Sequence, residues 1–337
     1  QIVPSINIGN LFPQPNLQGG LPNGAFLFNL MGRRTSYLQQ WTFSVQKNLP
    51  FNLFWEVAYV GSKGAKLSKR YDRNVGTIPV AGDTRPVSAR RPYPNLGFIL
   101  SDEGAGLSKY HAIQSSLRKT YSNGLTFMFN YLYGRSMDTD SYDGKATRFY
   151  RPGDNDYGRS IFDIRQRAVL SFNWELPFFK GTKGAAKYIL DGWSMNSITS
   201  FQTGLPFHVA ANDRSGAGVN FGGRPNRICN GNLPAGDRTR FRWFDTTCFV
   251  EPALSTFGNA GVHYLDTDGL KGQDFGLFKN FNFTERHRLQ FRWEAFNAFN
   301  YTNLNRPGNS VSAPATFARI LAAQPARTMQ IGAKLYF

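Results

Sequence analysis

The sequence is poor in features that usually assign a chain of 337 residues to a class. It has only two cysteines, Cys229 and Cys248, which are too few for a disulfide scaffold or a thiolate metal site. No apolar run approaches the roughly 20 residues of a transmembrane helix. Residues 1–4 lack the basic and apolar regions of a signal peptide, so we expect a removed leader or a longer protein. These absences exclude helical membrane proteins and small disulfide-rich domains.

Signals of catalysis are equally scarce. The four histidines, His111, His208, His263 and His287, are scattered and lack the spacing of metal ligands. No nucleophile elbow, zincin helix or phosphate-binding loop motif occurs. We therefore predict that the chain is not an enzyme and carries no cofactor.

A weak calcium candidate is the acidic group Asp138, Asp140 and Asp143, which stands before Gly144. The spacing does not fit an EF-hand, and no bidentate glutamate follows at the required position. A solvated loop is the favoured interpretation, and we predict no other metal site.

The charge is strongly unbalanced, with 39 basic and 22 acidic residues and a formal net charge of +17. Nucleic-acid binding is the usual interpretation of such an excess. Here the basic residues are spread along the whole chain and form no basic helix or tail, so we predict no nucleic-acid partner. Two alternatives are a lumen lined with arginine and lysine, or loops that meet anionic lipopolysaccharide.

What the sequence does have is strict alternation, most clearly in its last eleven residues, RTMQIGAKLYF. Met329, Ile331, Ala333, Leu335 and Phe337 fall on one face of a strand, and polar or small residues fall mainly on the other. An apolar strand that ends on a phenylalanine is typical of an outer-membrane β-barrel, whose strands face lipid on one side.

Similar alternation predicts about nine strands, each about ten or more residues long, which suits tilted membrane-spanning strands. The predicted strands are 37–48, 51–61, 109–120, 125–135, 163–176, 191–203, 272–283, 286–299 and 327–337, and a tenth lies at 25–31 in an irregular lead-in, 1–36. Long loops are predicted near 62–107, 136–162, 204–268 and 300–326. Short turns at one edge and long loops at the other indicate that the long loops are extracellular.

Charged strand residues would be costly toward lipid, so we predict that they face the lumen. There they could contact a substrate or a plug, although pairing with neighbouring carboxylates is the more frequent role. The predicted lumen-facing residues are Arg118, Arg167, Arg288, Gln290, Arg292, Glu294, Gln330 and Lys334.

Several segments together resemble the C-terminal barrel region of TonB-dependent outer-membrane receptors, in particular the Oar-like group. The resemblance covers nearly the whole chain from about Thr35 onward. The matching segments are 35–50, 56–67, 242–249, 255–261, 275–308 and the closing IGAKLYF.

This resemblance implies an all-β, antiparallel transmembrane barrel of about 22 strands, closed by an N-terminal plug and driven by TonB. The chain, 37–337 above all, would supply the C-terminal part of that barrel, and we see no plug or TonB box in it. The resemblance also implies an integral protein of the Gram-negative outer membrane. Its partners would be outer-membrane lipid and lipopolysaccharide, TonB through a missing N-terminal region, and the barrel-assembly machinery. That machinery would recognise Met329, Ile331, Ala333, Leu335 and Phe337.

Both cysteines lie in one predicted outer loop. An oxidising compartment favours a disulfide between Cys229 and Cys248. Such a bond would restrain the loop by about 3 kcal/mol in the chain-entropy model. Two unpaired cysteines, or a partner outside the chain, are the alternatives.

Transport of a scarce substrate across the outer membrane is the predicted function. A structural or adhesive surface barrel without active transport is one alternative, and a soluble β-rich binding protein is another. Siderophore, cobalamin, glycan and peptide substrates all stay open, with a slight preference for peptides or proteins.

Overall fold

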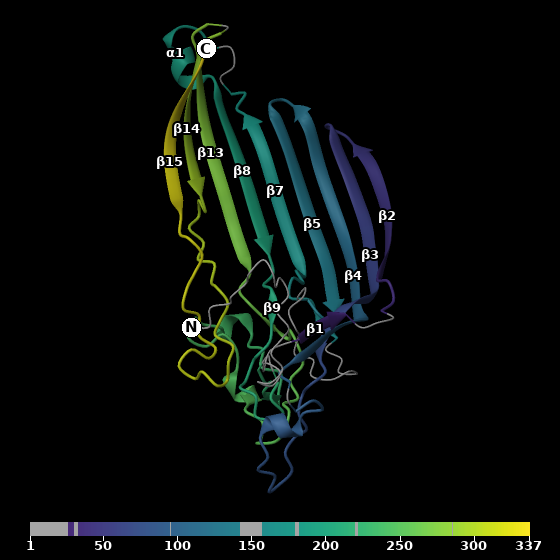
Figure 1. Ribbon diagram of the computed structural model, residues 1–337. Helices are drawn as coiled ribbons and strands as arrows, with labels where there is room; N and C mark the ends of the chain where they lie inside the picture. Colours follow the sequence, from purple (N-terminus) through teal and green to yellow (C-terminus); the bar gives the residue numbers. More distant parts are fainter. Residues whose placement is uncertain are drawn as a thin grey trace, which may run out of the picture.

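The fold is a large, mainly antiparallel β-sheet with irregular segments gathered at one end (Figure 1). The computed structural model describes residues 26–29, 33–94, 96–141, 157–178, 182–219, 222–284 and 286–337. Nine long strands are β2 (Tyr37–Leu49), β3 (Leu53–Asp72), β4 (Ile99–Ser122), β5 (Leu125–Asp138), β7 (Gln166–Glu175), β8 (Trp193–Gln202), β13 (Leu270–Asn282), β14 (Arg288–Phe296) and β15 (Thr328–Tyr336).

These nine strands are hydrogen-bonded in chain order, so the sheet is a continuous antiparallel meander. This confirms the predicted all-β fold class. Within the described residues the sheet stays open, with β2 and β15 at its edges. Two short strands lie off this path: β1 (Phe26–Asn29) pairs with β4, and β6 (Gly158–Arg159) pairs with β5. β1 falls within the predicted tenth strand, but it runs parallel to β4 and takes no place in the meander.

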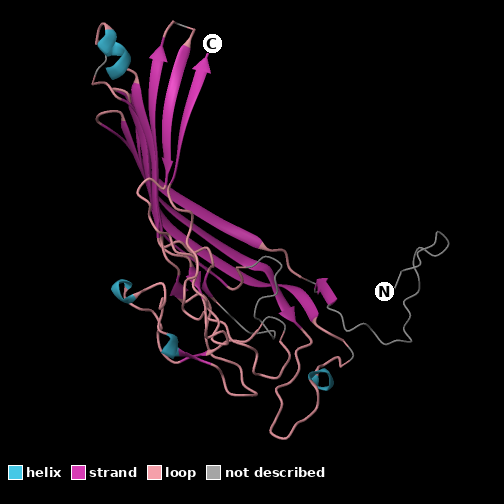
Figure 2. Cartoon of the chain, turned by 90° about the vertical axis from the view of Figure 1, so that its left-hand side faces the viewer, coloured by secondary structure: helices cyan, strands magenta, loops and turns pink. Residues whose placement is uncertain are grey.

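The two ends of the strands differ sharply. Short connections, the chain terminus and the helix α1 (Ala185–Leu190) lie at one end, and the long connections lie at the other (Figures 1 and 2). We call these the short-turn end and the loop end. Phe51, Asn52 and Asn123 adopt positive φ in the β2–β3 and β4–β5 turns. Asn123-Gly124 is thus the hairpin turn that its sequence predicts.

The predicted loop at 62–107 is shorter than expected. β3 continues to Asp72 and β4 begins at Ile99, which leaves 73–98, with the 3-10 helix η2 (Val87–Arg90), as the connection. The register shifts between Ala65 and Leu67, so a bulge interrupts the alternation there. Glycines, lysines and this bulge interrupt the alternation of apolar and polar residues in the sequence. The extended parts of β3 and β4 are strands nevertheless, because they pair with each other.

The register gives the sheet two consistent faces. On β14 and β15, Leu289 is opposite Leu335 and Trp293 is opposite Ile331. Across β13 the same face continues, with Leu277 opposite Trp293. We call this the apolar face. The polar face carries the intervening residues, and the predicted separation of the two kinds of side chain is present in the paired strands.

At the loop end, residues 203–219, 222–269 and 297–327 form what we call the loop assembly. Its short elements are β9 (Pro206–Phe207), paired with β12 (Leu265–Asp266), β10 (Asn226–Arg227), paired with β11 (Phe249–Val250), and the 3-10 helices η3 (Ala235–Asp237) and η4 (Thr246–Cys248). The predicted loops 204–268 and 300–326 are therefore folded against each other. Backbone bonds join them, such as Trp243 N–H to the Ala318 carbonyl at 2.9 Å.

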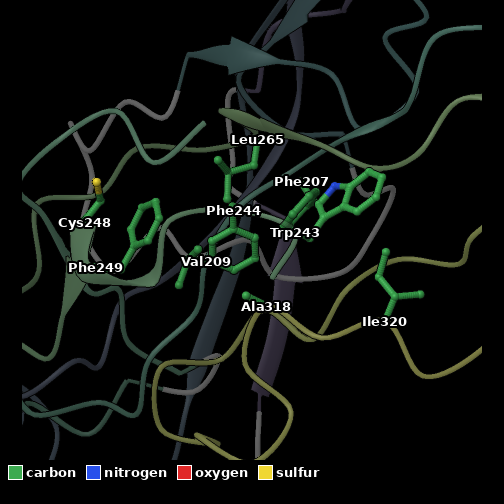
Figure 3. Packing of buried hydrophobic residues seen from close by; sticks show 9 residues of the cluster. All are labelled: Phe207, Val209, Trp243, Phe244, Cys248, Phe249, Leu265, Ala318 and Ile320. Atoms are coloured by element: carbon green, nitrogen blue, oxygen red, sulfur yellow. The ribbon is translucent and has the colours of Figure 1, made fainter. Parts of the chain in front are cut away.

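The loop assembly has a hydrophobic core of its own (Figure 3). Phe244 is 1% exposed, and its ring centroid lies 5.2 Å from Phe317 and 5.9 Å from Phe207. A disulfide joins Cys229 to Cys248, whose Cα atoms are 4.9 Å apart. The core and the disulfide together tie segments that are distant in the sequence.

Candidate functional site

The polar face of the sheet holds all eight residues that the sequence places in the lumen. Gln290, Arg292 and Glu294 alternate with the apolar residues of β14, and Gln330 and Lys334 are opposite them on β15. The same register, followed across the sheet, places Arg118, Arg167 and Arg288 on this face. Their orientation toward a lumen stays a prediction.

Side chains on this face form two hydrogen-bonded groups, one between β14 and β15 and one between β13 and β14. Gln330 Nε2 donates to Glu294 Oε2 at 2.6 Å, and Arg292 donates to Gln290 Oε1 at 2.8 Å. Gln290 Nε2 in turn donates to Asn280 Oδ1 at 3.0 Å. Such hydrogen bonds pair polar groups along a surface where water or a solute can replace individual partners.

The eight residues do not converge on one point. At the short-turn end, the Arg288 guanidinium lies 4.1 Å and the Lys334 ammonium 4.6 Å from the ring centroid of Tyr336. Arg118 lies over Phe54 at the same end, 5.3 Å from its ring centroid. Arg167, at the start of β7, is at the loop end. The residues therefore line a surface that runs the length of the strands.

This surface is mixed in charge. By register, carboxylates share it with the basic residues, among them Glu56, Asp138, Glu175, Asp274 and Glu294. A lumen lined chiefly with arginine and lysine, one of the two interpretations of the net charge, does not describe it. Local patches of either sign can instead orient a zwitterionic or hydrogen-bonding solute.

Lysines bracket the uncharged part of the apolar face. On β4, Lys109 and Lys119 both lie on this face, and the outward positions between them carry no carboxylate, lysine or arginine. Ten residues of strand at a tilt of 35–45° span roughly 23–27 Å along the membrane normal. That height matches the apolar band of an outer-membrane barrel, at whose borders lysine side chains typically extend toward water.

A cavity of about 630 Å³ lies where the loop assembly meets the sheet. Gln202 and Leu270, which are paired at the ends of β8 and β13, line it from the sheet. Its polar lining from the loops comprises His208, His263, Thr267, Asp268, Asn303, Asn305, Arg306 and Gln324. The cavity thus combines the end of the strands with three segments of the loop assembly.

Two histidines that the sequence leaves far apart meet at this cavity. The ring centroids of His208 and His263 are 4.9 Å apart, and both side chains are buried. His263 Nδ1 lies 2.6 Å from the Arg159 carbonyl, which orients its ring. Sequence reasoning missed this pair because the two residues lie in different loop segments and show no metal-ligand spacing.

Ion pairs fasten the loop assembly to the sheet. Arg159, in β6, binds Asp163 at 2.8 Å and Asp266 at 2.7 Å. Burial by itself lowers the pKa of Arg159, but the hydrogen bond with Asp163 and the charge of Asp266 outweigh it and raise the pKa. A second pair, Arg214 with Glu251 at 2.6 Å, joins two parts of the loop assembly.

The weak calcium candidate gains no support from the described residues. Asp138 is buried, and both its carboxylate oxygens accept a hydrogen bond from Ser141 Oγ at 2.8 Å. Asp143 lies outside the described residues. Among the residues that are described, no group of three or more histidine, cysteine, aspartate or glutamate side chains could hold a metal ion.

The terminal strand has the pattern expected of an assembly signal. Met329, Ile331, Ala333 and Leu335 lie on the apolar face of β15, and Phe337 follows the strand with 93% of its surface exposed. Its recognition by the barrel-assembly machinery stays a prediction.

Across the described part of the chain, no helix is long and apolar enough to cross a membrane.

A long-stranded antiparallel sheet with an apolar band on one face and a polar surface on the other defines a segment of an outer-membrane barrel. The family model described as "Outer membrane beta barrel domain" matches residues 2–330, and the chain belongs to that family. It is therefore an integral protein of the Gram-negative outer membrane. No curated protein matches the sequence.

Solved structures with a similar arrangement include the outer membrane transporter YddB from Escherichia coli, with 12% identity and a TM-score of 0.49 over 94% of this chain and 34% of that one. The FrpB iron transporter from Neisseria meningitidis has 10% identity and a TM-score of 0.44 over 92% of this chain and 32% of that one. The ferripyoverdine receptor of Pseudomonas aeruginosa has 10% identity and a TM-score of 0.45, over 89% and 27%. The chain spans about a third or less of the length of these proteins.

Proposed function

We propose that this chain is the C-terminal wall and outer-loop portion of a TonB-dependent transporter that imports a scarce substrate. The observation that carries the proposal is the continuity between the cavity and the polar face. Gln202 and Leu270 line the cavity, and Gln202 is also opposite Arg167 on the polar face. A solute held by the loop assembly would therefore have a hydrogen-bonding surface leading toward the short-turn end.

The rest of the proposed machine would complete the barrel and supply the energy. TonB would act through a region N-terminal to this chain, and the polar residues Gln290, Arg292 and Glu294 of β14 would contact the substrate or a plug. The apolar face would contact outer-membrane lipid, and the basic loops would meet lipopolysaccharide. The substrate would carry positive and negative groups or hydrogen-bond donors and acceptors, because the polar face carries both acidic and basic side chains.

The proposal is tested by uptake in cells that carry the full-length gene, its deletion, or a TonB deletion. A ferric siderophore, cobalamin, a labelled oligosaccharide pool and a labelled peptide pool serve as probes. We expect uptake of at least one probe class to require both the protein and TonB. Uptake of every class that is the same in all three strains, with surface attachment lost in the gene deletion, would instead support an adhesive barrel.

A matched pair of variants tests the path itself. Ser200 lies on the polar face of β8, two residues from Gln202, whereas its neighbour Thr199 lies on the apolar face. Ser200→Trp would narrow the path and lower uptake, and Thr199→Trp would leave it near the wild-type rate. Equal uptake by both variants would contradict a path along this face.

A further inference from the structure

The connection between β7 and β8 differs from the other connections at the short-turn end. Those between β2 and β3, β4 and β5, and β13 and β14 are short, whereas this one spans 176–192 and contains α1. Residues 176–190 include three lysines and no acidic residue. A basic turn that contains a helix is more than the strands need in order to reverse direction.

The described part of this turn exposes large apolar side chains. Phe178 is 66% exposed, Tyr188 55% and Ile189 69%. A helix of six residues is too short to persist by its own hydrogen bonds. Contacts with the sheet must therefore hold α1 in place while its apolar side chains stay uncovered.

The side-chain contacts described next come from the apolar face. The Trp193 indole donates to the Ile189 carbonyl at 2.9 Å, and the ring of Trp174 packs edge-on against Phe178 at 5.5 Å. Lys279 Nζ donates to the Asp191 carbonyl and lies 5.4 Å from the Trp193 ring centroid. Trp174, Trp193 and Lys279 share the apolar face by register. The turn thus continues the lipid-facing surface at its border.

Other basic side chains lie along the same border of the sheet and in the turn itself. Lys47 and Lys119 also lie on the apolar face at the short-turn end, and Lys119 Nζ donates to the Phe51 carbonyl at 2.7 Å. Lys183 and Lys187, in the turn, are exposed. Apolar side chains beside lysines at this depth match a segment that lies in the headgroup layer rather than across the bilayer.

We propose that Phe178 and 182–190 form a membrane foot, which lies in the phospholipid headgroup layer at the short-turn end of the barrel. Phe178, Tyr188 and Ile189 enter the boundary of the acyl chains, and Lys183 and Lys187 bind the phosphates of anionic phospholipid. The foot anchors and orients the barrel wall. This role depends on the protein's place in the outer membrane and is independent of what the barrel transports.

Site-directed fluorescence on the full-length protein in lipid nanodiscs tests the foot. Ile189→Cys is labelled with the polarity-sensitive probe NBD; Cys229 and Cys248 are bonded to each other, and any cysteine outside this chain is replaced by serine. The control is Leu254→Cys, a residue of the loop assembly that is 72% exposed. We expect a blue-shifted NBD emission, quenched by doxyl-labelled lipid, at position 189 and a solvent-like emission at position 254.

The charge contribution is tested with Lys183→Gln and Lys187→Gln in the Ile189→Cys protein. In phosphatidylglycerol-containing discs, each change lowers the ratio of lipid-inserted to solvent-exposed probe, resolved by fluorescence lifetime, roughly fivefold. In phosphatidylcholine discs the ratio stays the same. Heat-modifiable migration verifies that each variant is folded.

Two results would overturn the proposal. One is a solvent-like emission of the probe at position 189 in both kinds of disc. If the same probe were shielded in native envelopes, a periplasmic protein rather than lipid would cover the foot, and the proposal would also be wrong. The other is an inserted probe whose ratio does not respond to the lysine substitutions in phosphatidylglycerol, because headgroup binding would then contribute nothing.

Discussion

The long-stranded sheet and the loop assembly differ in where they place their large apolar side chains. In the strands, several of the buried residues are small, such as Ala58, Ala112 and Ala295, whereas many large apolar side chains, such as Phe43 and Ile331, are exposed. In the loop assembly the large side chains are buried: Phe207 and Phe244 are each 1% exposed. The apolar face of the sheet thus suits a lipid environment, whereas the loop assembly buries its large apolar side chains in its own core.

This contrast separates two sources of stability. The strands of an outer-membrane barrel gain theirs from hydrogen-bonded pairing and from the bilayer that covers their apolar face. The loop assembly, in water, depends on a packed core, a disulfide and ion pairs. Changes directed at one region should therefore leave the other largely intact, and predictions can be built on that independence.

The largest effect is expected from opening the core of the loop assembly. Phe244→Ala removes a ring that packs against Phe207, Phe249 and Phe317, and should lower local stability by about 3–5 kcal/mol. Hydrogen exchange of the full-length protein in detergent measures it, through faster exchange in 203–269 and 297–327 and unchanged exchange in β13 and β14. Faster exchange throughout the sheet would show that the two regions are one cooperative unit.

A charge in the middle of the apolar band should be the next most damaging change, and it acts on the other region. Ile113 lies between Lys109 and Lys119 on the apolar face of β4, and its neighbour Gln114 lies on the polar face. Ile113→Arg should destabilise the membrane-inserted sheet by roughly 2–4 kcal/mol. The matched control, Gln114→Arg, should cost much less, as measured by denaturant unfolding in lipid vesicles. Equal costs would mean that the face assigned to lipid is wrong.

Reduction of the disulfide should have a comparable effect, again confined to the loop assembly. Cys229 and Cys248 are 19 residues apart, and a bond that closes such a loop contributes about 3 kcal/mol in the chain-entropy model. Dithiothreitol should therefore make the loop assembly sensitive to a protease while the strands stay resistant. The Cys229→Ala/Cys248→Ala protein should show the same cleavage with or without reductant, and a reductant effect in it would point to another cause.

The sequence predicts the sheet far better than it predicts the loop assembly, for a physical reason. A strand between lipid and water must alternate apolar and polar residues along the chain. The face of Phe291, Arg292 and Trp293 can therefore be predicted from their immediate neighbours in the sequence. The core of the loop assembly needs no local period, because Phe207, Phe244 and Phe317 come together from distant segments. The cavity and its two histidines depend on the same long-range packing, so the sequence alone shows them only as irregular loop residues.

The smallest expected effect is a pH dependence within the loop assembly. Ser312 Oγ donates to Glu251 at 2.6 Å, and this hydrogen bond, followed by those from Arg214, lowers the pKa of Glu251. Because the folded-state pKa is below the unfolded one, this stabilisation is present above the unfolded value of about 4.3 and is lost as the pH falls through the folded value.

Acid should therefore weaken the contacts of Glu251 with Arg214 and Ser312, which join the three segments of the loop assembly, before it affects the strands. Trp243 reports on this, since the other five tryptophans lie in β2, β3, β7, β8 and β14. We expect the thermal transition of Trp243 fluorescence to move to lower temperature as the pH is reduced from 6 to 3, and Glu251→Gln to flatten that shift. A shift of the same size in Glu251→Gln would assign the acid sensitivity to another carboxylate, with Asp245 the next to test because its hydrogen bonds with Thr247 also lower its pKa.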